Sequence, residues 1–268
     1  MEKKKIIFIL ELLAVVLAVG AAVFCIIRVM NKTPAADNNG VTQPPPSLIS
    51  SGEIEGIDTY MRPAYYIAHR GLSGQAPENS IASIVEAGKA DYYGCEFDIR
   101  LTSDGKWVLM HDEDSDRTTN GKGKVAELTY EQLSAYRIDT GNNVSLYSDS
   151  QKVIPTLDDA LLLCNEYAMM PFIEVKSSAP EGISELLNML ERRYLTETVM
   201  IISFDMDILK AIREENADIS LMLLCDKVTD KTIAECVEAG DIGIDFNAKN
   251  IKDSQIEAIS DAGLALDA

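Results

Sequence analysis

The sequence predicts a (β/α)8 TIM barrel over residues 63–268, and two observations predict it. Eight short apolar runs alternate with amphipathic helical patterns along this stretch. The polar residues that could carry out chemistry follow several different runs, as they do in barrel active sites. A doubly wound open sheet is the rival fold, and the lack of a glycine-rich phosphate loop after the first strand favours the barrel.

The strand candidates are short apolar runs bounded by turn residues, which suits buried parallel strands. In chain order they are "AYYIAH", "GCEFDIRL", "WVLMH", "MMPFIEVK", "TVMIISF", "SLMLLC", "IGIDF" and "GLALDA". Helical spacing of apolar residues follows most of them, in "SIASIVEAGKA", "TLDDALLLCNEY", "GISELLNMLERR", "DMDILKAIREEN", "DKTIAECVEAG" and "SQIEAISDAG". Ser80 is expected to cap the first of these helices.

An apolar run near the N-terminus predicts a membrane anchor. Residues 6–27 are apolar except for Glu11 and are long enough to cross a bilayer of roughly 30 Å hydrocarbon thickness. A cleaved secretory signal is the alternative, although its apolar region is shorter, and the residue before Cys25 is too large for a lipoprotein signal. We expect residues 1–30 to form a single-pass anchor in the cell membrane. Lysines before the span favour a position of the rest of the chain outside the cytoplasm.

The next segment and the charge balance narrow the range of partners. Residues 31–62 are rich in Asn, Pro, Ser and Gly and are expected to be a flexible linker. Residues 1–62 hold six basic and six acidic side chains, so the predicted barrel, with 18 basic and 37 acidic ones, carries the whole net charge of −19. Nucleic acid is therefore not expected as a partner. The sequence leaves the oligomeric state open.

Three carboxylates are expected to meet inside the barrel. Glu96 and Asp98 are two apart in "GCEFDIRL", so they share one face of a strand, and Glu174 and Lys176 do the same in "PFIEVK". Like charges crowded in a partly dry interior are costly unless a cation joins them. An all-oxygen site of this kind suits Ca²⁺ or Mg²⁺.

The two histidines of the chain, His69 and His111, each end a strand candidate. They could act as a general base and a general acid on one reacting group. Arg70 beside His69, and Lys176 beside a predicted metal ligand, supply positive charge for a phosphate. Together these residues predict a metal-assisted displacement at a phosphodiester.

The ordered motifs "HRG", "PENS", "EFDIRLTSDGKWVLMHDEDSDRTTNGKGKVAELT", "IPTLDDAL", "FIEVK" and "SFDMDIL" resemble the glycerophosphodiester phosphodiesterase family over about residues 65–268. The resemblance suggests a membrane-anchored bacterial member. It implies a barrel that hydrolyses glycerophosphodiesters to sn-glycerol 3-phosphate and an alcohol, with Ca²⁺ or Mg²⁺ bound. It implies these roles: His69 as proton acceptor, His111 as proton donor to the leaving alcohol, Glu96, Asp98 and Glu174 as metal ligands, and Arg70 and Lys176 as phosphate contacts.

Glu78 of "PENS" matches a family acid that is expected to orient Arg70 or His69, and the alternative is an acid at a helix N-terminus before Ser80. Two other functions stay open beside the hydrolase. One is a lyase that expels the alcohol through a cyclic phosphate, as barrel phospholipases do, and it would use the same histidines. The other is a non-catalytic barrel that binds ligand, which the loss of a histidine would have favoured.

The end of the sequence departs from the family pattern. Relatives continue past "GLALDA" with an aromatic-rich run that completes the eighth strand, whereas this sequence ends at Ala268. We therefore expect an incomplete last strand, which either reflects a fragment or is covered by another element, because exposed sheet edges are normally avoided.

Overall fold

The structure is a computed structural model and describes residues 65–176, 180–193 and 195–267. The chain divides into two units, Met1–Glu55 and Gly56–Ala268, and all described residues belong to the second. The predicted anchor at residues 1–30 and the predicted linker at residues 31–62 lie outside the described residues. Within the described ranges, every helix is too short or too polar to span a bilayer.

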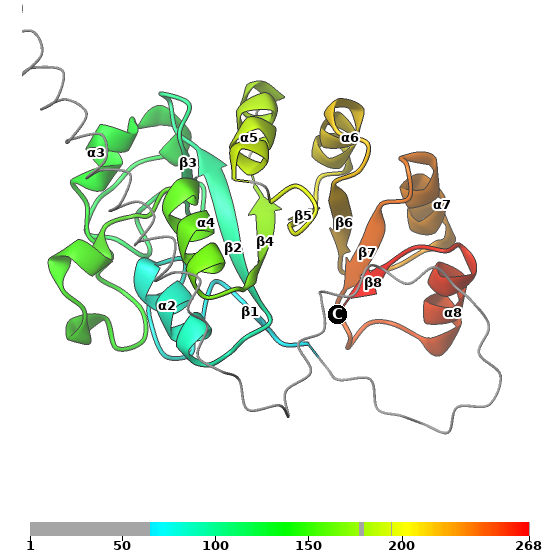
Figure 1. The fold of residues 1–268 in the computed structure, drawn as a ribbon, viewed down its shortest axis with the longest axis horizontal. Coiled ribbons are helices and arrows are strands. Elements are labelled where there is room, and N and C mark those ends of the chain that lie inside the picture. The colour runs from blue at the N-terminus through cyan, green and yellow to red at the C-terminus, as the bar shows by residue number, and fades with distance from the viewer. Residues whose placement is uncertain (1–64, 177–179, 194, 268) are drawn as a thin grey trace, which may run out of the picture. The chain divides into compact units, whose positions relative to one another are not determined.

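A curled parallel sheet, with helices ranged along its length, forms the frame of the second unit (Figure 1). Its strand order is β1-β2-β4-β5-β6-β7-β8. The strands are β1 (Ile67–Ala68), β2 (Gly94–Leu101), β4 (Met170–Val175), β5 (Met200–Ser203), β6 (Ser220–Cys225), β7 (Gly243–Phe246) and β8 (Leu266–Asp267). Strand pairing among the described residues runs from β1 to β8 without a β8–β1 pair, so the sheet is barrel-like and open. The predicted fold is therefore confirmed as a barrel-like α/β arrangement of strands and helices.

One predicted barrel strand is wrong. The run "WVLMH" was expected to join the parallel series, but β3 (Trp107–Leu109) pairs antiparallel with β2, with Trp107 opposite Leu101. The reason is connection length: residues 102–106 form a tight hairpin, whereas a parallel crossover needs about a dozen residues or more. His111 therefore follows an antiparallel strand and does not end a parallel one.

The helices connect the strands and bury their apolar faces against the sheet. They are α2 (Ile81–Lys89), α3 (Tyr130–Ser134), α4 (Leu157–Glu166), α5 (Pro180–Arg192), α6 (Met206–Glu215), α7 (Asp230–Glu238) and α8 (Asp253–Asp261), with 3-10 turns η1 (Val125–Glu127), η2 (Val144–Leu146) and η3 (Asp149–Lys152). The Ser80 side chain accepts a hydrogen bond from the Ser83 backbone, which confirms the predicted cap of α2.

The period of two along β2 decides which side chains reach the site. Cys95, Phe97 and Ile99 are fully buried in the core shared with the helices. Burial of a side chain such as Phe97 stabilises the fold by roughly 1.5–3 kcal/mol. Glu96 and Asp98, between these apolar positions, point to the inner face of the curled sheet. The apolar outer face thus holds the strand in place while its carboxylates face inward.

A layer of apolar side chains lines the same inner face. Phe172, Met200, Ile202 and Met222 form a separate buried cluster on strands β4, β5 and β6. Phe172 is the register partner of Glu96 on the neighbouring strand. The carboxylates therefore lie next to an apolar surface, where their charged forms are poorly solvated.

Candidate active site

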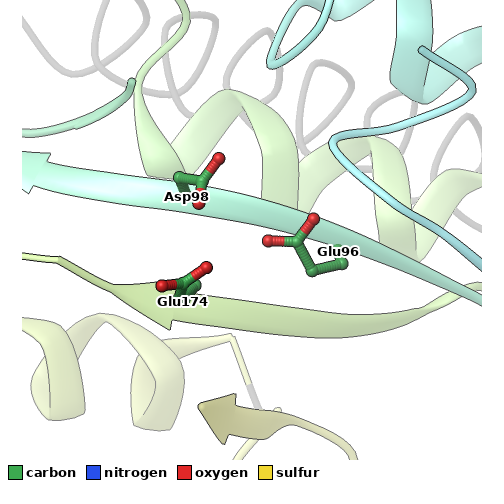
Figure 2. Close-up of side chains that lie close together, drawn as sticks. All are labelled: Glu96, Asp98 and Glu174. Carbon is green, nitrogen blue, oxygen red and sulfur yellow. The ribbon is translucent and has the colours of Figure 1, made fainter. Parts of the chain in front are cut away.

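Three carboxylates meet on the inner face of the sheet. Figure 2 shows Glu96 and Asp98 of β2 and Glu174 of β4 turned toward one another. One oxygen of each lies within 4.8 Å of the others. Asp98 and Glu174 are register partners on adjacent parallel strands, and all three residues are buried. The structure thus brings together the three residues predicted as metal ligands.

The unsatisfied oxygens of this cluster fit a divalent cation. Among the described residues, Glu96 Oε1 is a buried side-chain oxygen without a hydrogen-bond partner, and Asp98 Oδ1 also accepts no hydrogen bond although it lies 3.2 Å from Lys176 Nζ. Burial, together with the negative charge of Asp98, raises the pKa of Glu96 well above its usual range. Burial also raises the pKa of Glu174 to about 7. A cation bound by these oxygens would offset the repulsion between the carboxylates and would give a partner to oxygens that accept no hydrogen bond. The all-oxygen donor set suits Ca²⁺ or Mg²⁺.

The turn after β1 places His69 and Arg70 at the rim of the cluster. Arg70 has a left-handed backbone with φ of 57°, which is uncommon outside glycine. Its backbone N–H donates to Glu96 Oε2 at 2.7 Å, and the next N–H, of Gly71, donates to the Glu96 carbonyl at 3.0 Å. The Ser73 hydroxyl donates to the His69 carbonyl at 2.9 Å. These bonds stabilise the unfavourable backbone conformation of Arg70 and attach the turn to β2.

Gly71 in the "HRG" motif is required by both conformation and space. Its φ is +71°, and an added Cβ would lie 2.3 Å from Ser83 Oγ and 2.7 Å from the Ser83 backbone carbon. We expect Gly71→Ala to lower the free energy of unfolding by about 1–3 kcal/mol, measured by urea denaturation. Gly74→Ala is the matched control, because nothing lies within 4 Å of its added Cβ. Equal stability of the two variants would contradict this account of the turn.

The surroundings of His69 favour the neutral form of its imidazole. Partial desolvation of the ring, and then the positive charge of Arg70, lower its pKa below the usual 6.5, with the charge of Asp98 acting in the opposite direction. A lowered pKa keeps the imidazole neutral near pH 7, and a neutral ring nitrogen can take up a proton.

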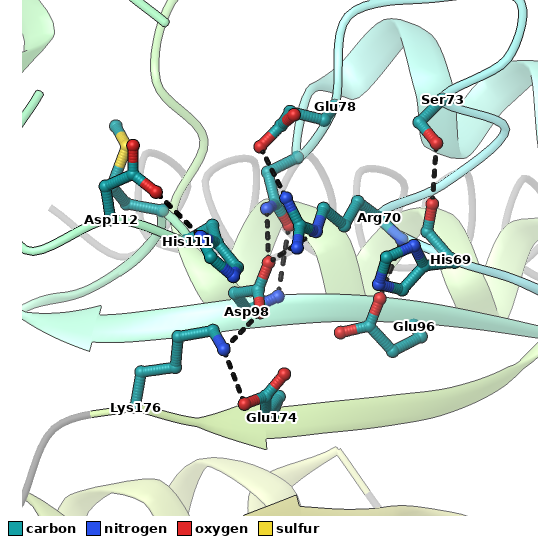
Figure 3. Close-up of polar contacts among 12 residues, drawn as sticks. His69, Arg70, Ser73, Glu78, Glu96, Asp98, His111, Asp112, Glu174 and Lys176 are labelled. Carbon is teal, nitrogen blue, oxygen red and sulfur yellow. Dashed lines mark hydrogen bonds and ion pairs between the residues drawn. The ribbon is translucent and has the colours of Figure 1, made fainter. Parts of the chain in front are cut away.

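The two predicted phosphate contacts lie beside the carboxylates (Figure 3). Arg70 Nε is 3.4 Å from Asp98 Oδ2, and Lys176 Nζ is 3.2 Å from Asp98 Oδ1 and 2.5 Å from Glu174 Oε1. Burial alone would raise the pKa of Asp98, but the charge of Lys176 and a hydrogen bond from Asn79 outweigh it and lower that pKa. Asp98 is therefore the member of the cluster that stays ionised most readily.

His111 reaches the site because the β2–β3 hairpin turns back on itself. The Met110 backbone N–H donates to the Asp98 carbonyl at 3.0 Å, and the Arg100 guanidinium donates to the His111 carbonyl from Nε at 3.0 Å and Nη2 at 2.7 Å. Figure 3 shows His69 and His111 on opposite sides of Asp98. The chain thus offers one imidazole on each side of the carboxylates, although the predicted reason for the position of His111 was wrong.

Asn79 is a site residue that the sequence analysis missed. Its Nδ2 donates to Asp98 Oδ2 at 2.7 Å, and its Oδ1 accepts from the Asp98 backbone N–H at 3.0 Å. The residue is buried and has a left-handed backbone with φ of 50°. Its place in "PENS", beside the predicted Glu78, was an available signal, because asparagine tolerates this conformation better than most residues.

Glu78, Asp112 and Arg117 form a polar chain along one side of the site. Glu78 Oε1 accepts from Arg70 Nη1 at 3.0 Å, so the structure places Glu78 against the first of its two predicted partners. Glu78 also accepts two hydrogen bonds from Arg117, which in turn donates two to Asp112. Neither Asp112 nor Arg117 was predicted. The adjacent His-Asp pair was a usable signal for Asp112, whereas Arg117 bonds residues of two loops that are distant in sequence.

A cavity adjoins the metal-ligand candidates. It has a volume of about 260 Å³ and is lined in part by Glu174, Lys176, Ser203 and Phe204. Phe204 is 60% exposed, and the Lys176 ammonium lies 5.9 Å from the centroid of its ring. The cavity therefore offers room and an aromatic wall beside Lys176.

An open α/β barrel that brings together three carboxylates able to hold a hard cation, two histidines and two basic side chains has the groups that chemistry on a phosphate ester uses. The family model described as "Glycerophosphoryl diester phosphodiesterase family" matches residues 69–267. The chain belongs to this family, which confirms the resemblance drawn from its motifs.

Curated relatives and solved structures agree with the family. Glycerophosphodiester phosphodiesterase 1 of Homo sapiens is 37% identical over 155 residues, which cover 57% of this chain and 46% of that protein. The enzyme of Caldanaerobacter subterraneus is 35% identical over 161 residues, 59% of this chain and 65% of that protein. The chain spans about half the length of the curated relatives it matches.

Among solved structures, an Oleispira antarctica phosphodiesterase, determined with the product sn-glycerol-3-phosphate, has a TM-score of 0.67 and 26% identity. The similarity covers 75% of this chain and 81% of that one. A glycerophosphodiester phosphodiesterase of Agrobacterium tumefaciens, with a TM-score of 0.62 and 23% identity over 75% of this chain and 84% of that one, shares the fold.

Proposed function

We propose that the chain is a metal-dependent phosphodiesterase that hydrolyses glycerophosphodiesters to sn-glycerol 3-phosphate and an alcohol. The observation that carries the proposal is the buried three-carboxylate cluster, with Glu96 Oε1 unbonded and an imidazole on either side of Asp98. Membership of the family and the product bound in the Oleispira antarctica neighbour support the substrate class.

The proposed mechanism assigns one task to each side chain. His69 accepts a proton from the attacking water, whose oxygen bonds to phosphorus. The bond from phosphorus to the alcohol oxygen breaks, and His111 gives that oxygen a proton. Arg70 and Lys176 hold the phosphate oxygens. A divalent cation on the carboxylates, which we propose to be Ca²⁺ or Mg²⁺, would supply neutralisation of the phosphate charge.

An assay of the chain with glycerophosphocholine tests this function. We expect sn-glycerol 3-phosphate and choline to appear in equal amounts, to vanish with excess chelator and to return with Ca²⁺ or Mg²⁺. A cyclic glycerophosphate as the end product would favour the lyase instead. Binding without turnover would favour the non-catalytic barrel. Turnover that persists in excess chelator would remove the metal from the mechanism.

The carboxylate cluster predicts a pH-dependent stabilisation by metal. The pKa of Glu174 is about 7 in the fold against an ordinary 4.5, so its protonated form contributes stability that is lost as pH rises through about 7. A bound cation replaces that proton, so we expect Ca²⁺ or Mg²⁺ to raise the melting temperature more at about pH 8 than at about pH 6. Calorimetry with Na⁺ at matched ionic strength is the control. An equal gain at both pH values would contradict the site.

We also propose that residues 1–30 anchor the enzyme in the cell membrane with its catalytic domain outside the cytoplasm. The apolar run at residues 6–27, with lysines before it, supports this placement. Cell fractionation tests the proposal: the chain should stay with membranes after an alkaline wash and be cleaved by external protease. A version lacking residues 1–30 should leave the membrane fraction, and equal behaviour of both versions would refute the anchor.

A further inference from the structure

A single arginine joins the two ends of the site. Arg117 lies in the loop after β3 and donates to carboxylates on either side of it. On one side, Nε bonds Asp112 Oδ2 at 2.5 Å and Nη2 bonds Asp112 Oδ1 at 3.1 Å. On the other side, Nη1 bonds Glu78 Oε2 at 3.1 Å and Nη2 bonds Glu78 Oε1 at 2.7 Å. The planar guanidinium thus holds two carboxylates in one fixed geometry.

Each of these carboxylates contacts a group at the reacting centre. Asp112 Oδ1 is 2.7 Å from His111 Nδ1, and Glu78 Oε1 accepts from Arg70 Nη1 at 3.0 Å (Figure 3). Hydrogen bonds therefore connect the proposed proton donor, His111, to the proposed phosphate contact, Arg70, through Arg117.

We propose that Arg117 is a positioning residue, which fixes the ring of His111 through Asp112 and ties it to Arg70 through Glu78. The proposal rests on the proposed function and assigns to that function a residue that touches neither the phosphate nor the leaving alcohol. A lysine could not replace it, because a single ammonium cannot bond both carboxylates in a planar fork.

The protonation states make the inference chemically specific. Hydrogen bonds from Arg117 are the main reason that the pKa values of Asp112 and Glu78 are held below their usual range. Both carboxylates are therefore ionised and can only accept hydrogen bonds. His111 Nδ1 must then be the donor to Asp112, which leaves Nε2 as the nitrogen free to face a leaving group. A carboxylate that accepts a hydrogen bond from an imidazole also stabilises the positive charge of the protonated ring.

The exposure of Arg117 argues against a purely structural role. Its side chain is 46% exposed, and ion pairs at such positions contribute little to stability because water and salt screen them. Removing the guanidinium should therefore leave the fold intact and change the orientation of the two groups it holds.

Two substrates distinguish positioning of the proton donor from general damage. Glycerophosphocholine has a poor leaving alcohol that needs a proton, whereas the p-nitrophenyl ester of sn-glycerol 3-phosphate has a leaving group that departs without one. We expect Arg117→Met and Arg117→Lys to lower kcat on glycerophosphocholine by about 10- to 100-fold. The loss on the p-nitrophenyl ester should be much smaller. Arg192→Met, which removes an exposed arginine paired with Glu185 on α5, is the matched control and should leave both rates unchanged.

Nuclear magnetic resonance of the imidazoles gives a readout that does not depend on turnover. The chain has two histidines, so a His69→Gln background leaves His111 as the single signal in long-range ¹H–¹⁵N spectra. When Arg117 is present, we expect Nδ1 of the neutral His111 ring to carry the proton. After Arg117→Met, we expect the tautomer population of His111 to move toward the Nε2–H form. Equal losses on the two substrates, or an unchanged tautomer, would overturn the proposal. Should the unaltered chain hydrolyse neither substrate, the proposed function fails, while the spectra still decide the role of Arg117.

Discussion

Replacing either histidine with alanine is expected to lower kcat on glycerophosphocholine by roughly 10²- to 10⁴-fold, the usual contribution of a general acid or base. His69 has a lowered pKa and lies after β1, and His111 lies on the other side of Asp98 and is bonded through Nδ1 to Asp112. The two variants should differ in one respect. His111→Ala should recover much of its rate on the p-nitrophenyl ester, which needs no proton donor, whereas His69→Ala should stay impaired on both substrates.

Control measurements separate loss of chemistry from loss of fold. His69 is exposed and His111 is partly exposed, so neither variant opens a cavity in the core, and both should keep the wild-type melting temperature. A variant that retains full activity on glycerophosphocholine would remove that histidine from the mechanism. Identical substrate profiles for the two variants would contradict the assignment of one as base and the other as acid.

Asp98→Asn is expected to lower kcat/KM by at least about 10²-fold, because a neutral amide would be a weak ligand for the proposed hard cation, which would contribute several kcal/mol of charge stabilisation. Asp98 is the fully buried member of the cluster and the one whose pKa is lowered. Isothermal titration with Ca²⁺ and Mg²⁺ should show the same loss in cation affinity. The amide has the shape of the carboxylate, so the fold should persist.

The matched control for this variant is Asp158→Asn on α4. That carboxylate is 56% exposed and pairs with Arg193 away from the cluster. It should change neither cation binding nor turnover. Loss of activity in Asp98→Asn with unchanged cation affinity would show that Asp98 acts in another way, for example by holding Lys176.

The alternation along single strands was readable from the sequence. Glu96 and Asp98 are two residues apart, and the period of two in a strand places them on one face whatever surrounds the strand. The same holds for Glu174 and Lys176. That Asp98 and Glu174 become register partners is a property of the pairing of β2 with β4, strands separated by more than sixty residues in the chain. Periodicity within a strand carries no information about this register.

The strand direction before His111 was predicted wrongly from the apolar run alone. An apolar run that ends in a histidine looks the same whether its strand is parallel or antiparallel, and the run "WVLMH" was assigned to the parallel series for that reason. The short hairpin at residues 102–106 decides its direction. His111 reaches the site because the hairpin returns alongside Asp98, with Arg100 holding the backbone of His111.

The sequence by itself determined the family, the alternation of strands and helices, and the residue types suited to a cation and a phosphate, because these are recorded in motifs and in short-range periodicity. Only the tertiary structure decided that Asn79 orients Asp98 and that Arg117 joins Glu78 to Asp112. Glu78 and Arg117 are 39 residues apart and lie in different loops. Their contact depends on how two loops fold over the same edge of the sheet, and no local pattern in the chain specifies it.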